Sequence, residues 1–143
     1  MSRRVSLSAE HLRAIEAHGE AAYPAEGVGF ILGRVNGETV LVEALLPLPK
    51  RREAAAQHNR YELSPQDFMR AELEAAQRGA DVVGVFHSHP DHPAEPSAFD
   101  REHALPNFSY LITSVMEGRA GVTRAWRLRD DRRAFDEDQM ATV

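Results

Sequence analysis

The hydrophobic positions of this 143-residue chain follow two periods, which predicts a mixture of helices and strands. In two stretches, apolar residues recur three and four positions apart behind a serine that is typical of a helix N-cap. These patterns predict one helix after Ser8 and another after Ser64. In the second helix we expect Met69, Leu73 and Ala76 to form the buried face.

Short runs rich in valine, isoleucine and aromatic residues predict the strands. Asn36-Gly37 separates two of these runs, and this dipeptide is typical of a tight hairpin turn. The mixed charges after Arg127 predict a solvated edge and a frayed end. Strands interleaved with two or three helices favour an α/β fold in a single domain over residues 1–143. The expected strands are 28–32, 39–46, 61–63, 82–86, 108–115, 122–128 and 134–135.

Composition excludes several classes of protein. The chain has no cysteine, which rules out disulfides, thiolate ligands and a cysteine nucleophile. Neither a signal peptide nor a run of apolar residues long enough to span a membrane is found, so we expect a cytoplasmic protein with no membrane partner. The net charge of −5 argues against nucleic-acid binding. The segment 47–60 predicts a long loop with a basic cluster, either a solvated turn or a docking surface.

Residues 84–100 carry the candidate chemistry. His87 and His89 follow an apolar strand directly, and side chains two apart on a strand point to one face, about 6.6 Å from each other along the backbone. After a proline-rich turn, Ser97 and Asp100 occupy the first turn of a predicted helix and share one of its faces. Two imidazoles and one carboxylate can therefore converge on one point.

Each part of this pattern also has an ordinary structural explanation. A single histidine at a strand end is usually a packed or exposed side chain, and Ser97 with Asp100 is typical of a helix N-cap pair. The combination changes the interpretation, because two histidines and an aspartate leave a fourth position open. Three protein ligands plus one open position are typical of a catalytic zinc ion.

The sequence H-S-H at 87–89, followed by the seven residues from Pro90 to Pro96 and then S-A-F-D at 97–100, resembles the signature of the JAMM (MPN-plus) metalloproteases. That family also has an upstream glutamate in a P-x-E-x-x-G-x-x-x-G setting, which matches residues 24–33 and places Glu26 at the glutamate position. Val28 stands where many members have a cysteine that is not a ligand. The resemblance implies a curved mixed sheet of the cytidine-deaminase type, flanked by helices.

The site chemistry and the resemblance agree on the roles of five residues. His87, His89 and Asp100 would hold one Zn²⁺ per chain, with water completing the site. Glu26 would act as general base and Ser97 would donate a hydrogen bond to the oxyanion. The expected reaction is hydrolysis of a peptide or isopeptide amide.

The chain is similar to the short prokaryotic members of the family, such as bacterial sulfur-carrier–cysteine peptidases. That resemblance implies a small ubiquitin-like or sulfur-carrier protein with a Gly-Gly tail as substrate, joined to cysteine or to a protein lysine. The tail could add as a strand to 108–115 or to 39–46. Whether the protein forms a homodimer stays open.

Two other functions stay open from the sequence. A metal-dependent phosphoesterase would need further ligands, for which only His92 and His103 are near the motif. A non-catalytic MPN-type scaffold would lack ligands that are present here. The other histidines, His11, His18 and His58, are expected on the surface.

Overall fold

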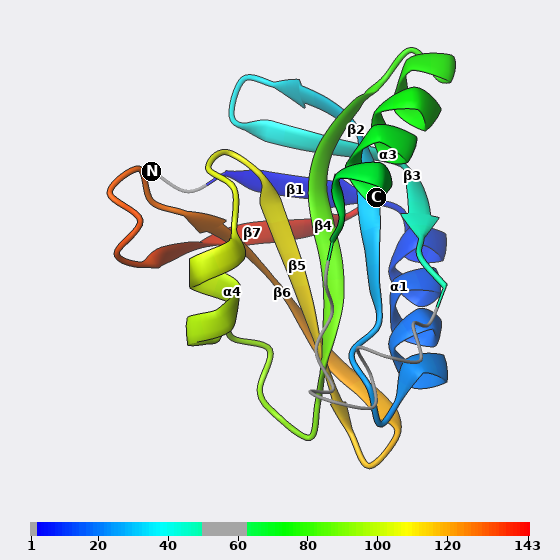
Figure 1. The fold of residues 1–143 in the computed structure, drawn as a ribbon, viewed down its shortest axis with the longest axis vertical. Coiled ribbons are helices and arrows are strands. Elements are labelled where there is room, and N and C mark those ends of the chain that lie inside the picture. The colour runs from blue at the N-terminus through cyan, green and yellow to red at the C-terminus, as the bar shows by residue number, and fades with distance from the viewer. Residues whose placement is uncertain (1–2, 50–62) are drawn as a thin grey trace.

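A computed structural model describes residues 3–49 and 63–143, and its strands form one closed, mixed sheet (Figure 1). The strand order around the ring is β1-β3-β2-β4-β5-β6-β7, and β7 returns to pair with β1. Three pairs are parallel, namely β1 with β3, β1 with β7 and β4 with β5, and the others are antiparallel. The predicted mixed α/β fold is confirmed.

The strands are β1 (Arg4–Leu7), β2 (Val28–Asn36), β3 (Thr39–Pro47), β4 (Asp81–Pro90), β5 (Ser109–Met116), β6 (Arg119–Leu128) and β7 (Phe135–Thr142). The helices are α1 (Ala9–Ala22), α3 (Pro65–Gln77) and α4 (Ala98–His103).

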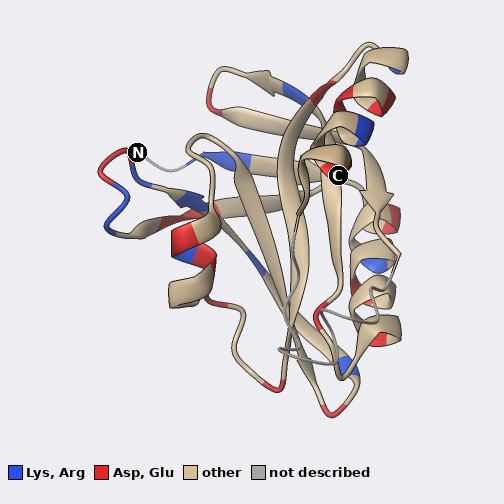
Figure 2. Ribbon diagram, in the orientation of Figure 1, with Lys and Arg blue, Asp and Glu red and all other residues tan. Residues whose placement is uncertain are grey.

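The two long helices begin where the sequence predicts. The Ser8 hydroxyl accepts a hydrogen bond from the His11 amide at the start of α1. Ser64 and Asp67 form a reciprocal capping box at the start of α3, which satisfies two amides that the helix itself leaves unpaired. Charged residues occur along both helices (Figure 2), as expected for helices with one face in solvent.

Two hydrophobic clusters lie on opposite faces of the sheet. One contains Ile15 of α1 and Phe86 of β4. The other contains Ala71 of α3 and Val85 of β4. Since side chains alternate along a strand, β4 presents Phe86 and Ser88 to the α1 face, and Val85, His87 and His89 to the other. Two helices thus fix β4 from both sides close to the candidate ligands.

The predicted buried face of α3 is wrong. Met69 and Leu73 are 63% and 60% exposed, and Ala76 is exposed as well. The buried side chains are Ala71 and Ala75, whose small size allows the helix to pack close to β2 and β4. Helical periodicity identified the helix, but the larger apolar residues do not mark the side that faces the core.

The sequence analysis also missed how the sheet closes. It predicted no strand before α1, and after Leu128 it predicted only a short strand and a frayed end. The structure instead has β1 and an eight-residue β7, which pair in parallel from Arg4↔Gln139 to Leu7↔Thr142. Residues 61–62 of the predicted strand 61–63 and most of the 47–60 loop lie outside the described residues, and Leu63 itself is not in a strand. Within the described ranges, no helix is both long and apolar enough to cross a membrane.

Candidate metal centre

The two histidines lie at the end of β4, which is paired on both sides. His87 is opposite Val28 of β2 in the antiparallel register and opposite Ile112 of β5 in the parallel one. Their rings are 5.0 Å apart between centroids, and the residues are 1% and 6% exposed. A central strand therefore holds both imidazoles side by side in the protein interior, as the period of two predicted.

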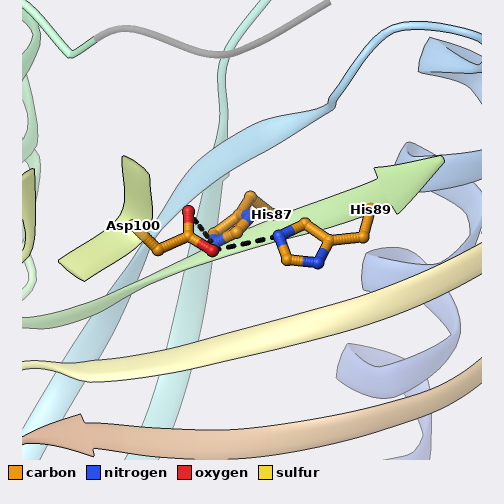
Figure 3. A group of neighbouring side chains, drawn as sticks. All are labelled: His87, His89 and Asp100. Atoms are coloured by element: carbon orange, nitrogen blue, oxygen red, sulfur yellow. Dashed lines mark hydrogen bonds and ion pairs between the residues drawn. The ribbon is translucent and has the colours of Figure 1, made fainter. Parts of the chain in front are cut away.

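Asp100 reaches the same point from the first turn of α4 (Figure 3). Its Oδ1 lies 3.5 Å from His87 Nε2 and its Oδ2 lies 3.0 Å from His89 Nε2. Asp100 also forms a capping box with Ser97, because the Ser97 amide donates to Oδ2 at 2.8 Å and the Asp100 amide donates to Ser97 Oγ at 3.1 Å. The helix cap and the convergence on the histidines are thus both present.

Hydrogen bonds fix which His89 nitrogen faces the centre. His89 Nδ1 lies 3.0 Å from the carbonyl oxygen of Pro93, which can only accept, so Nδ1 carries a hydrogen. Nε2 is left to face Asp100, the arrangement in which a neutral histidine can ligate a metal through Nε2.

The charges of the three residues are strongly coupled. Burial lowers the pKa of His87 to about 4, although Asp100 opposes the shift. Burial also acts to lower the pKa of His89, but the hydrogen bond and charge of Asp100 outweigh it, so this pKa is raised. Burial acts to raise the pKa of Asp100, whereas His87, His89 and the Ser97 amide together lower it to about 2. At neutral pH the group therefore offers a neutral His87 and an ionised Asp100.

This donor set fits a zinc ion. One ligand atom from each of His87, His89 and Asp100 lies within 4.8 Å of the others, and all three residues are buried. Two imidazole nitrogens and one carboxylate are ligands that zinc accepts, and three protein ligands leave a position for water or substrate. Among residues 3–49 and 63–143, this is the one group of three or more such side chains close enough to share an ion.

A pocket of about 610 Å³ opens beside His89, one of the three candidate ligands. Glu26 and Ser97, which the sequence predicts as catalytic, both line it together with His89. The negative charge of Glu26 also contributes to the raised pKa of His89. The structure therefore brings all five predicted residues to one site.

Ser88 has a role that the sequence analysis missed. It lies between the two candidate ligands in the sequence, but its side chain points to the opposite face of the sheet, where its hydroxyl accepts a hydrogen bond from the Gly27 amide at 2.8 Å. The Ser88 amide in turn donates to the Gly27 carbonyl at 3.0 Å. This pair of bonds ties the residue after Glu26 to the strand of the ligands. Alternation along the strand was the available signal, since a small polar residue there must face the helix side.

The other histidines differ in their surroundings. His92 lines the pocket and is exposed, and His103 is exposed and stacks on Phe99 within α4. The surface assignment of His18 is wrong, because its ring is partly buried against Phe86 and its Nε2 lies 3.1 Å from the Val28 carbonyl oxygen. His58 lies outside the described residues.

The sequence profile described as prokaryotic homologues of the JAB domain matches residues 8–129, which is most of the chain. The chain belongs to this prokaryotic JAB family. The resemblance to JAMM proteins that the two motifs predicted is thereby confirmed.

Two relatives of this JAB-family chain carry functional names. It is 37% identical over 119 residues to a desampylase from Haloferax volcanii, covering 79% of this chain and 82% of the relative. It is 31% identical over 101 residues to a probable TtuB-protein conjugate cleaving protease from Thermus thermophilus, covering 71% of this chain and 64% of the relative.

Solved structures agree on the fold. A protein from Salinibacter ruber has a TM-score of 0.76 and 41% identity, with 96% of this chain and 91% of that chain covered. A JAB1/MPN domain protein from Archaeoglobus fulgidus has a TM-score of 0.57 at 16% identity, covering 98% of each chain. The second likeness supports the JAB/MPN fold alone.

Proposed function

We propose that this JAB-family protein is a zinc-dependent isopeptidase. It would hydrolyse the amide that follows the C-terminal Gly-Gly of a ubiquitin-like or sulfur-carrier protein. The observation that carries the proposal is the buried group of His87, His89 and Asp100, with Glu26 and Ser97 on the walls of the same pocket. The relatives named as a desampylase and as a conjugate-cleaving protease support the class of substrate.

Each residue has a distinct task in this proposal. Zinc held by the two histidines and Asp100 would supply Lewis-acid activation of water and of the scissile carbonyl. Glu26 accepts a proton from the attacking water and delivers it to the leaving amine. The Ser97 oxygen accepts the Asp100 amide of the helix cap, so its own O–H remains available to donate to the developing oxyanion.

The surroundings of the pocket suit an extended tail without side chains. Of the two strands proposed to receive the tail, β5 is excluded, because it is paired with β4 and β6 along its length. In β3, only Thr39–Leu41 pair with β1, so in the described part of the chain residues 42–47 have no strand partner on that side. This open edge ends at Pro47, opposite Gly29 of β2, which follows Glu26 by three residues, and could hold the tail by strand addition.

A comparison of three substrates tests the proposal. The protein is incubated with a carrier–cysteine adduct, a carrier–lysine isopeptide conjugate and casein, each with and without a chelator. We expect chelator-sensitive cleavage after the terminal glycine of at least one carrier substrate and little cleavage of casein. Cleavage of the lysine conjugate alone favours protein deconjugation, and cleavage of the cysteine adduct alone favours a step in cysteine synthesis. Equal cleavage of casein would defeat the tail-specific proposal.

Metal analysis tests the ligands independently of any substrate. The purified protein should hold about one zinc per chain, and His89→Ala or Asp100→Ala should lose it. Full zinc in both variants would refute the ligand assignment. Absence of zinc from the wild type, with the fold intact, would favour a scaffold function.

A phosphoesterase is less well supported by the site. Two-metal phosphoesterases need a second set of ligands next to the first, about 3.5–4 Å between ions. His103 does not line the pocket and its Nδ1 bonds the Phe99 carbonyl, so of the two further histidines only His92 is at the pocket. Among the described residues, no second group of three possible ligands is close enough together to share an ion. A phosphatase assay run beside the amidase assay separates the two functions.

A further inference from the structure

In the loop that follows the histidine motif, three consecutive backbone carbonyl groups accept hydrogen bonds from side chains of the sheet. Residues 90–96, called here the 90–96 loop, connect β4 to α4. The carbonyl of His92 accepts a hydrogen bond from Ser114 Oγ at 2.7 Å. The carbonyl of Pro93 accepts one from His89 Nδ1 at 3.0 Å, and that of Ala94 accepts one from Trp126 Nε1 at 2.9 Å.

These three donors come from three adjacent strands of the sheet. His89 lies on β4, Ser114 on β5 and Trp126 on β6. The loop itself has prolines at 90, 93 and 96, and proline has no amide hydrogen to donate, so the loop can offer few backbone donors of its own. Side chains of the sheet must therefore fix the direction of its carbonyls.

The indole of Trp126 is itself held in place. The guanidinium of Arg124 stacks 4.8 Å from the centre of the indole ring, and the same arginine forms an ion pair with Glu95 of the loop at 3.2 Å. Trp126 is only partly buried, and it also lines a second groove that continues from Ser97. Its N–H is therefore a fixed donor whose acceptor is the loop.

We propose that Ser114 and Trp126 are positioning residues for the metal ligand His89. By holding the carbonyls on either side of Pro93, they fix the acceptor that sets the orientation and tautomer of the His89 ring. When the acceptor that bonds the second ring nitrogen of a ligating histidine is removed, metal affinity typically falls about 10–100-fold. Because these two residues act through a neighbouring peptide group, we expect the lower end of that range. The inference rests on the proposed zinc site, but it concerns residues outside the family motif.

The experiment measures metal affinity rather than activity. Zinc affinity is measured by competition with a chromophoric chelator for the wild type, Trp126→Phe and Ser114→Ala. Phenylalanine keeps an aromatic ring but removes the N–H, and alanine removes only the hydroxyl. We expect each variant to bind zinc about tenfold more weakly than the wild type. Cobalt-substituted protein should also show altered visible absorption, which reports the ligand geometry directly.

A matched control lies one residue away. Thr113 Oγ1 and Thr123 Oγ1 share a hydrogen bond of 2.7 Å between β5 and β6, the same two strands, without touching the loop. Thr113→Val should therefore leave zinc affinity within about twofold of the wild type, even if it lowers thermal stability. Ser114→Thr retains a hydroxyl and should restore most of the affinity lost in Ser114→Ala.

Several outcomes would overturn the inference. Zinc affinity within twofold of the wild type in both Trp126→Phe and Ser114→Ala would do so. An equal loss in Thr113→Val would show a general effect of destabilising the sheet. If Trp126→Phe fails to fold, Ser114→Ala and its threonine counterpart decide the matter. A wild type that binds no zinc would instead refute the proposed function, a result that the same titration distinguishes.

Discussion

Replacement of Ser88 by alanine should disturb the positioning of Glu26 without affecting the binding of zinc. Ser88 is 2% exposed, and its hydroxyl accepts the buried amide of Gly27 at 2.8 Å. Its side chain points away from His87 and His89, toward α1, where a Cβ added to Gly19 would lie 3.0 Å from the Ser88 Cβ. The substitution therefore removes a hydrogen bond to the segment that carries Glu26. It removes no interaction of the proposed metal ligands.

The magnitude follows from the amide that is left behind. Gly27 is enclosed by Ala22 and His18, which lie 3.0 and 3.1 Å from the position of a Cβ there, so little room remains for water to replace the hydroxyl. A buried donor without a partner costs about 1–3 kcal/mol in the free energy of unfolding. For a chain of this size, that loss lowers the melting temperature by roughly 3–10 °C.

The effect on catalysis should exceed the effect on metal binding. A displacement of about 1 Å in a catalytic group can cost on the order of 100-fold in rate, so we expect kcat to fall between about tenfold and 100-fold. Zinc content should remain about one per chain. Chemical denaturation, metal analysis and turnover of a carrier conjugate are measured on the same preparation.

Ser109→Ala provides the matched control for this experiment. Ser109 is also buried, at 0% exposed, but its hydroxyl has no hydrogen-bond partner among the described residues. Its replacement should therefore cause no loss of stability or turnover. Equal losses in the Ser88 and Ser109 variants, or an unchanged Ser88→Ala protein, would refute the reasoning.

Further expectations concern the catalytic residues, the pH dependence and the closure of the sheet. Glu26→Gln should keep its zinc and lose turnover, since an amide cannot carry the proton; an active, zinc-loaded variant would remove Glu26 from the mechanism. Ser97→Ala should also keep zinc and lose about 10²–10³ in kcat, and an unchanged rate would exclude the hydroxyl as oxyanion donor. Because the pKa of His89 is raised, the ring is protonated below that pKa and zinc must displace a proton; chelator competition should show affinity falling about tenfold per pH unit there and levelling off above it. A flat profile throughout would contradict this linkage. Asp138 is buried on β7 and accepts the Arg3 amide at 3.0 Å, so Asp138→Ala should cost about 1.5–3 kcal/mol in unfolding free energy. The exposed Glu137→Ala should cost at most about 1 kcal/mol, and a reversed order in denaturation would count against the role of β7.

The part of the structure that the sequence predicts well is local. The N-caps at Ser8, Ser64 and Ser97 and the hairpin signalled by Asn36-Gly37 need only neighbouring residues, and the structure contains all four. The two residues of the hairpin loop are Gly37 and Glu38, one position later than the dipeptide, because Asn36 still pairs with Thr39. The convergence of His87, His89 and Asp100 is local as well, because these three residues lie within 14 positions of the sequence and the strand period places two of them together.

The failures come from long-range packing. The sequence F-D-E-D-Q-M-A-T of β7 alternates weakly and has four charged or amide side chains, so it lacks the pattern of a buried strand. It becomes a strand because β1 offers a parallel partner from the other end of the chain. The hydrogen bond from the Arg3 amide, next to β1, to Asp138 of β7 joins residues that are 135 positions apart. Likewise, the buried side of α3 is selected by the space over β2 and β4, which admits alanine and leaves Met69 and Leu73 outside.

The pair Ser97 and Asp100 shows why the structural and functional explanations of a motif need not compete. The helix cap orients the carboxylate, since Asp100 Oδ2 accepts the Ser97 amide and cannot rotate away without losing that bond. The same oxygen lies 3.0 Å from His89 Nε2, so the cap places a charge against the histidines before any metal arrives. A carboxylate anchored in this way loses little conformational freedom on binding an ion, which favours affinity. The cap therefore allows a short helix of six residues to place Asp100, the proposed third ligand, next to the histidines of a buried strand.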